Sequence, residues 1–169
     1  MPVHLGGGVA NVGENLKMTI EGAVGRLLMS IGTVVAGFLP LLVDLSPTHV
    51  LNPAWPAHAR LHEVWLLATG SLLALVALYF IWLYRDRPRF GIAMGAVLGS
   101  VLLGGFFAAS ATSSLYGGIL VDPVTAPMMP NQDLIWGMPL NGFVFGLAWL
   151  SLLSGAALTT GATRTSVAG

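Results

Sequence analysis

Four long apolar stretches, separated by shorter polar segments, dominate the chain. They cover approximately residues 24–43, 64–84, 90–116 and 134–159. A helix needs about 20 mainly apolar residues to cross the roughly 30 Å hydrocarbon layer of a bilayer, so each stretch predicts one transmembrane helix. We therefore predict an all-α integral membrane four-helix bundle at residues 24–160, with an N-terminal tail at 1–23 and a C-terminal tail at 161–169.

Two of these stretches carry residues that affect the helix itself. The third is rich in glycine, alanine and serine, which let helix backbones approach closely in lipid, so we expect it to be the most buried helix. The fourth contains Pro139, which predicts either a kink or a late helix start at that point.

Composition agrees with a membrane protein and excludes several other classes. Hydrophobic residues make up 55% of the chain and charged residues 8%, whereas a soluble domain carries roughly a quarter charged residues. Seven basic residues balance seven acidic ones, which leaves no excess positive charge for nucleic acid. The chain has no cysteine, which excludes disulfides, thiolate zinc sites and iron–sulfur clusters.

The basic residues orient the predicted bundle. Only Arg60 lies on one side of it, and the other six basic residues flank the opposite side: Lys17, Arg26, Arg85, Arg87, Arg89 and Arg164. Because cytoplasmic loops carry the excess of lysine and arginine, we expect both termini to be cytoplasmic and the protein to span a bacterial inner membrane.

The connection from Asp44 to Glu63 collects the polar chemistry, including three of the four histidines. Its last part follows Pro56 and leads straight into the second apolar stretch, so we predict that it forms the first turns of that helix. His58 and His62 would then share a helix face, about 5 to 6 Å apart at Cβ. Two imidazoles at this spacing can hold one metal ion, or one can ligate while the other supports it.

A structural role is the alternative for these residues. His58, Arg60, His62 and Glu63 can close a helix end at the headgroup level, with Arg60 and Glu63 paired across one turn. Asp44 is equally compatible with a helix-end residue and with a pocket acid. Other polar groups could face a cavity on the same side of the bundle, namely Tyr116, Asn131, Gln132 and Asn141.

The sequence lacks HExxH, Walker, GxGxxG and GxSxG motifs. The remaining polar groups suit a small hydrophobic pocket for an apolar substrate taken from the bilayer, a haem, or both.

Three short motifs, Ala59-Arg60-Leu61-His62, Tyr116 and Pro130-Asn131-Gln132, give the chain a resemblance to the styrene oxide isomerase family, small four-span membrane enzymes. Ala59-Arg60-Leu61-His62 is similar to the family's Ala-Arg-x-His, whose histidine is the axial haem ligand. Tyr116 falls where the family has a pocket tyrosine, and Pro130-Asn131-Gln132 follows at nearly the family's distance. Ala68 and Ala108 stand where the family has Asn and Asp, so the resemblance leaves the substrate open.

The resemblance implies a homotrimer that binds haem b and acts on an apolar small molecule. His62 would ligate ferric iron, which would act as a Lewis acid on an epoxide oxygen and give an aldehyde without net redox change. His58 and Arg60 would complete the haem site, and His58 or Glu63 would orient His62. Tyr116, Asn131 and Glu63 would be the catalytic groups, with Tyr116 donating a hydrogen bond to the developing alkoxide.

A weaker resemblance leads to the EXPERA-type sterol isomerases and sterol-binding proteins. The segment from Phe38 to Asp44, followed by Trp55 and Glu63, is loosely similar to their first-helix Pro and Asp and second-helix Trp and Glu. There a protonated carboxyl would give a proton to an alkene and a neighbouring base would remove another, without a metal. A third hypothesis is a non-catalytic haem carrier or a membrane assembly subunit.

Overall fold

The computed structural model describes residues 6–121 and 139–168 and confirms the all-α class. It contains α1 (Gly6–Asp44), α2 (Ala57–Trp82), α3 (Pro88–Thr112), the short 3-10 helix η1 (Ser113–Leu115) and α4 (Leu140–Ala168). No strand occurs in these two ranges. The predicted four-helix bundle is therefore correct.

Each of the four long helices contains a segment long and apolar enough to cross a membrane, namely Thr19–Asp44, Ala57–Trp82, Pro88–Leu115 and Leu140–Ala162. The protein is a multi-pass membrane protein. α1 and α4 extend beyond their spans into the predicted tails, because hydropathy marks the segment inside lipid and not the end of the helical hydrogen bonds. α4 begins directly after Pro139, as predicted for a late start.

Glycines set the closest helix contacts. A Cβ at Gly25 of α1 would collide with Thr159 of α4, and one at Gly155 of α4 would collide with the Gly25 carbonyl. On the other side of α1, a Cβ at Gly37 would collide with Ala74 of α2. Small residues allow this approach, which matters in lipid because dispersion contacts replace the hydrophobic effect between helices.

The glycine-rich α3 is not the most buried helix, contrary to expectation. Only 22% of its most apolar window is buried, compared with 28% in each of the other three spans. Its buried glycines, Gly91, Gly95 and Gly99, form a single stripe at a spacing of four, while Val97 and Val101 are exposed. The small residues of α3 therefore mark the face that contacts other helices. They do not indicate how much of the helix is buried.

Polar side chains also join the helices. The Ser71 hydroxyl donates to the Gly37 carbonyl at 2.9 Å, which ties α2 to α1. Ser151 donates to the Leu28 carbonyl at 2.9 Å, and the Trp149 indole N–H donates to the Ser100 hydroxyl at 3.0 Å. Such bonds are worth on average about 0.6 kcal/mol each in membrane bundles, so they fix register more than they add stability.

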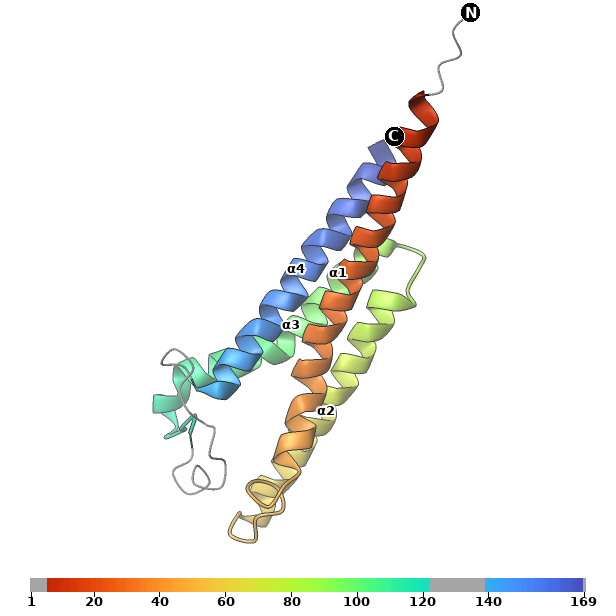
Figure 1. Cartoon of the computed structure of the whole chain (residues 1–169). Helices are drawn as coiled ribbons and strands as arrows, with labels where there is room; N and C mark the ends of the chain where they lie inside the picture. Colours follow the sequence, from red (N-terminus) through yellow and green to blue (C-terminus); the bar gives the residue numbers. More distant parts are fainter. Residues whose placement is uncertain (1–5, 122–138, 169) are drawn as a thin grey trace, which may run out of the picture.

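The helices separate toward one end of the bundle. α1 packs along α4 over much of its length, and the N- and C-terminal ends lie at the same end as the α2–α3 turn (Figure 1). At the opposite end, the α1–α2 connection and the end of α3 diverge (Figure 1). Among the described elements, η1 contacts only α3. The polar groups of the two regions are thus placed on separate arms of the bundle.

Candidate functional site

His58 and His62 meet at the start of α2, as their spacing predicts. Their Nε2 atoms lie 3.0 Å apart. The ring centroids are 4.4 Å apart and the rings are nearly perpendicular, at 89°. We call these two residues the histidine pair. Their convergence confirms the shared face, because residues four apart lie one above the other on a helix.

The histidine pair faces outward from the bundle. Both side chains are exposed, whereas the buried face of α2 carries Leu67, Gly70, Ala74, Ala77 and Ile81. The His62 ring stacks on Trp65 with centroids 6.0 Å apart. An open groove of about 310 Å³ lies beside it, lined by His62, Trp65, Leu66 and Thr69. The pair therefore borders lipid or another molecule and not the interior of the chain.

Glu63, next to His62 in the sequence, lies near the end of α1. It is half-buried and interacts electrostatically with Asp44 and His49. In the described part of the chain, Arg60 and Glu63 do not form the ion pair of the structural alternative, whereas Lys17 pairs with Glu21 and His49 contacts Asp44. Arg60 contributes its backbone N–H to the Pro56 carbonyl at 3.2 Å.

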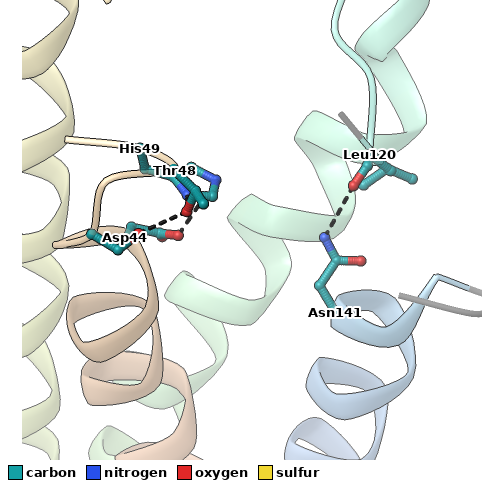
Figure 2. A network of polar contacts seen from close by, with 6 residues as sticks. Asp44, Thr48, His49, Leu120 and Asn141 are labelled. Atoms are coloured by element: carbon teal, nitrogen blue, oxygen red, sulfur yellow. Dashed lines mark hydrogen bonds and ion pairs between the residues drawn. The ribbon is translucent and has the colours of Figure 1, made fainter. Parts of the chain in front are cut away.

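Asp44 and His49 face each other across the turn that follows α1 (Figure 2). The His49 Nε2 atom lies 3.7 Å from the Asp44 carboxylate, and both side chains are partly buried. The Thr48 hydroxyl forms a hydrogen bond with His49 Nδ1 at 2.9 Å, and Ser46 forms one with Thr48 at 2.7 Å. We call Asp44, His49 and Glu63 the acid–base cluster.

The backbone of the connection produces this geometry. The His49 N–H donates to the Ser46 carbonyl at 3.1 Å, and the N–H of buried Val50 donates to the Asp44 carbonyl at 3.0 Å. These bonds cap the end of α1 and fold the chain back over its last turn. The His49 ring then packs edge-on against Trp55, with centroids 5.7 Å apart.

Sequence reasoning counted His49 among the loop histidines but did not assign it to a site. The signal was the segment Asp44-Leu-Ser-Pro-Thr-His49, because serine and proline directly after a helix predict a tight turn. A tight turn at that point brings a histidine five residues later back onto the last carboxylate. Asp44 accordingly contacts His49 as well as ending α1.

Tyr116 lies on the other arm of the bundle. Its hydroxyl donates to the Ala109 carbonyl of α3 at 2.6 Å, and the side chain is 61% exposed. Gly117, at φ 72°, continues the turn at this point. Within one chain, Tyr116 is therefore not joined to the histidine pair by any described contact.

None of the other predicted site residues that the structure describes joins the acid–base cluster or the histidine pair. Asn141 donates to the Leu120 carbonyl at 3.5 Å, which ties the start of α4 to the segment after α3 (Figure 2). Ala68 and Ala108 are exposed, and Asn131 and Gln132 lie outside the described residues. In the described part of the chain, no group of three or more His, Cys, Asp or Glu residues is placed to hold a metal ion.

A family model described as a family of unknown function, DUF6640, matches residues 28–149. The matched range contains the acid–base cluster, the histidine pair and Tyr116. No curated protein and no solved structure matches the chain.

Proposed function

The chain belongs to the DUF6640 family, and because the function of that family is unknown we propose an activity from the geometry of its own side chains. We propose that the protein is a membrane isomerase that moves a double bond in an apolar small molecule by proton transfer at the acid–base cluster. The observation that carries the proposal is the contact of His49 with Asp44 at 3.7 Å, with the half-buried Glu63 close enough to interact electrostatically with both.

The chemistry needs one group that gives a proton and one that takes it. Protonation of one alkene carbon leaves the cation on the other, and loss of a proton from the carbon next to that cation shifts the double bond, with no net change in protons or electrons. The Asp44–His49 pair and the Glu63 carboxyl supply these two roles. The hydrogen bond from Thr48 to His49 Nδ1 holds the imidazole in the orientation that places Nε2 toward Asp44.

The location of the cluster favours a substrate from the bilayer. Asp44 is the last residue of the first span and Glu63 lies in the second turn of the second span, so both carboxyls sit near one membrane surface. Ionisable groups within membrane-spanning helices cost free energy and commonly have a function. An unsaturated, sterol-like molecule is the substrate class, in agreement with the weaker resemblance to EXPERA-type proteins.

The test is isomerisation in heavy water. Full-length protein in lipid nanodiscs is incubated with unsaturated sterols in D2O, and the products are analysed by mass spectrometry and NMR. We expect a shifted double bond with one deuterium at the carbon that gains the proton. Asp44→Asn and Glu63→Gln should each lower the rate by roughly 10²- to 10⁴-fold, the typical contribution of a general acid or base.

Two exposed carboxyls serve as matched controls. Glu21 lies on α1 beside Lys17, and Asp86 lies in the α2–α3 turn at the opposite end of the bundle. Glu21→Gln and Asp86→Asn should leave the rate within about twofold of the unchanged protein. The proposal fails if the protein incorporates no deuterium into any member of a panel of unsaturated sterols, or if the cluster variants behave as the two controls do.

The haem-dependent epoxide isomerase is the competing proposal, and the exposed His62 beside an apolar groove is the observation that favours it. His62 would hold the iron, which would supply Lewis-acid chemistry toward an epoxide oxygen, and at present His58 Nε2 stands 3.0 Å from His62 Nε2. Haem ligation would require the His58 ring to turn away.

An absorption spectrum from 350 to 700 nm separates the two proposals. We expect purified protein to be colourless and to carry the sterol activity. A Soret band that disappears in His62→Ala would instead establish haem and make styrene oxide the first substrate to assay. The remaining proposals, a homotrimer and a bacterial inner membrane with cytoplasmic termini, are tested by the mass of the nanodisc-embedded complex and by protease access to the tails.

A further inference from the structure

We propose that the histidine pair binds a divalent transition metal ion directly, through Nε2 of His58 and Nε2 of His62. This site is separate from the acid–base cluster, and the inference does not rest on the proposed isomerase activity. Two features of the structure carry it: the convergence of the two ring nitrogens and the outward, open position of the pair.

The nitrogen geometry matches two neighbouring positions on one metal ion. With metal–nitrogen bonds of about 2.0–2.1 Å, tetrahedral ligands stand roughly 3.3 Å apart and ligands at right angles roughly 2.9 Å apart. The observed separation of 3.0 Å lies between these values. The two rings are nearly perpendicular and a hydrogen bond joins their Nε2 atoms, so a metal ion would take the place of the shared proton between them.

Two further features fix the ligands in place. The ring of His62 stacks on Trp65, which restricts its rotation. Both histidines belong to the same regular helix, α2, so their spacing is set by the helix and not by a loop. A preorganised pair of this kind loses little side-chain freedom when it binds metal.

The donor set selects the class of metal. Neutral imidazoles suit Zn²⁺, Cu²⁺ and Ni²⁺, whereas Mg²⁺ and Ca²⁺ require oxygen ligands. No third His, Cys, Asp or Glu joins the pair among the described residues. The ion would therefore keep open positions, filled by water or by a second copy of the chain, next to the groove lined by Trp65, Leu66 and Thr69. Metal sites that bind further ligands keep coordination positions that the protein does not fill.

The experiment measures binding to the full-length protein in detergent micelles, purified with an affinity tag that contains no histidine. Isothermal titration calorimetry gives the Zn²⁺ affinity and stoichiometry. Electron paramagnetic resonance of the Cu²⁺-loaded protein counts the coordinating nitrogens. We expect saturable Zn²⁺ binding and coupling to two imidazole nitrogens, or to four where a second copy shares the ion at one ion per two chains.

A swap variant provides the sharpest control. Arg60→His combined with His62→Arg keeps the composition and charge but moves the second imidazole two residues from His58, to the opposite side of the helix. We expect this variant, His58→Gln and His62→Gln each to lose at least about tenfold in Zn²⁺ affinity, since even outer-shell partners of metal ligands contribute 10- to 100-fold. His49→Gln should bind Zn²⁺ as the unchanged protein does.

Three results overturn the inference. One is Zn²⁺ binding that survives unchanged in the swap variant, and a second is an unchanged protein that binds neither Zn²⁺ nor Cu²⁺. Loss of binding in His49→Gln would also contradict it, because that result would move the ion to the acid–base cluster. Circular dichroism and gel filtration confirm that each variant keeps its helical content and size, so a loss of affinity is assigned to the ligands.

Discussion

The acid–base cluster and the histidine pair lie close together in the sequence but are assembled by different physics. The histidine pair is produced by one helix, since a spacing of four on α2 brings two rings together whatever the rest of the chain does. The acid–base cluster needs the end of α1, the turn after it and the second turn of α2 at once. One site is therefore local and the other depends on the packing of α1 against α2.

The two groups also face different surroundings. Glu63 is half-buried and interacts electrostatically with Asp44 at the end of α1, whereas His62, one residue earlier, is exposed. Adjacent residues on a helix are about 100° apart, which explains the division. The segment from His58 to Glu63 is therefore not one motif. It carries residues of two proposed sites, which lie on different faces of α2.

The packing of α1 against α2 offers the largest test of this difference. Gly37→Leu should push the two helices apart, because a Cβ at Gly37 already collides with Ala74. Overpacking of this kind costs about 1–3 kcal/mol in unfolding free energy. We expect the isomerase rate to fall by at least tenfold, which is roughly 1.4 kcal/mol in the barrier, while Zn²⁺ affinity stays within twofold.

Gly22→Leu is the control for that variant, because a Cβ at Gly22 of α1 meets nothing within 4 Å. Thermal unfolding in nanodiscs, the deuterium assay and calorimetry are applied to both proteins. Equal losses of isomerase rate and Zn²⁺ affinity in Gly37→Leu would show that the two sites depend on the same packing, and the comparison would be wrong.

A smaller effect is expected from removing the hydroxyl that orients His49. Thr48→Val deletes the hydrogen bond to His49 Nδ1 at 2.9 Å and the bond to Ser46. A net hydrogen bond is worth about 0.5–1.5 kcal/mol, so we expect the isomerase rate to fall by roughly two- to tenfold.

Thr69→Val is the matched control on the other site, since Thr69 lines the groove beside His62. It should leave the isomerase rate unchanged in the same deuterium assay. A greater loss in Thr69→Val than in Thr48→Val would indicate that the substrate lies in the outer groove and not at the acid–base cluster.

The smallest effect is expected at Tyr116. Tyr116→Phe removes a hydrogen bond to the Ala109 carbonyl at an exposed position, so the unfolding free energy should change by no more than about 1 kcal/mol. Because Tyr116 lies on the other arm of the bundle, the isomerase rate should stay within twofold. A loss of 100-fold or more would bring Tyr116 into the site across subunits and would favour the haem-dependent proposal.

The sequence by itself determined the class of the protein, the four spans and the histidine pair. Each depends on local properties: the length of an apolar run, the start of a helix after Pro56 or Pro139, and the helical spacing of His58 and His62. The sequence left Asp44 open between a helix-end residue and a pocket acid, and it assigned His49 to no site. The turn that brings these two residues together depends on backbone hydrogen bonds, such as the one from the Val50 N–H to the Asp44 carbonyl.

Tertiary structure alone decided the surroundings of Glu63, the low burial of α3 and the separation of Tyr116 from the histidine pair. Hydropathy cannot settle these points, because in a bilayer both lipid-facing and protein-facing side chains are apolar. Which face of a helix is buried depends instead on where glycines such as Gly25 and Gly37 allow close approach. That choice fixed which polar groups meet and which remain on the outer surface of the bundle.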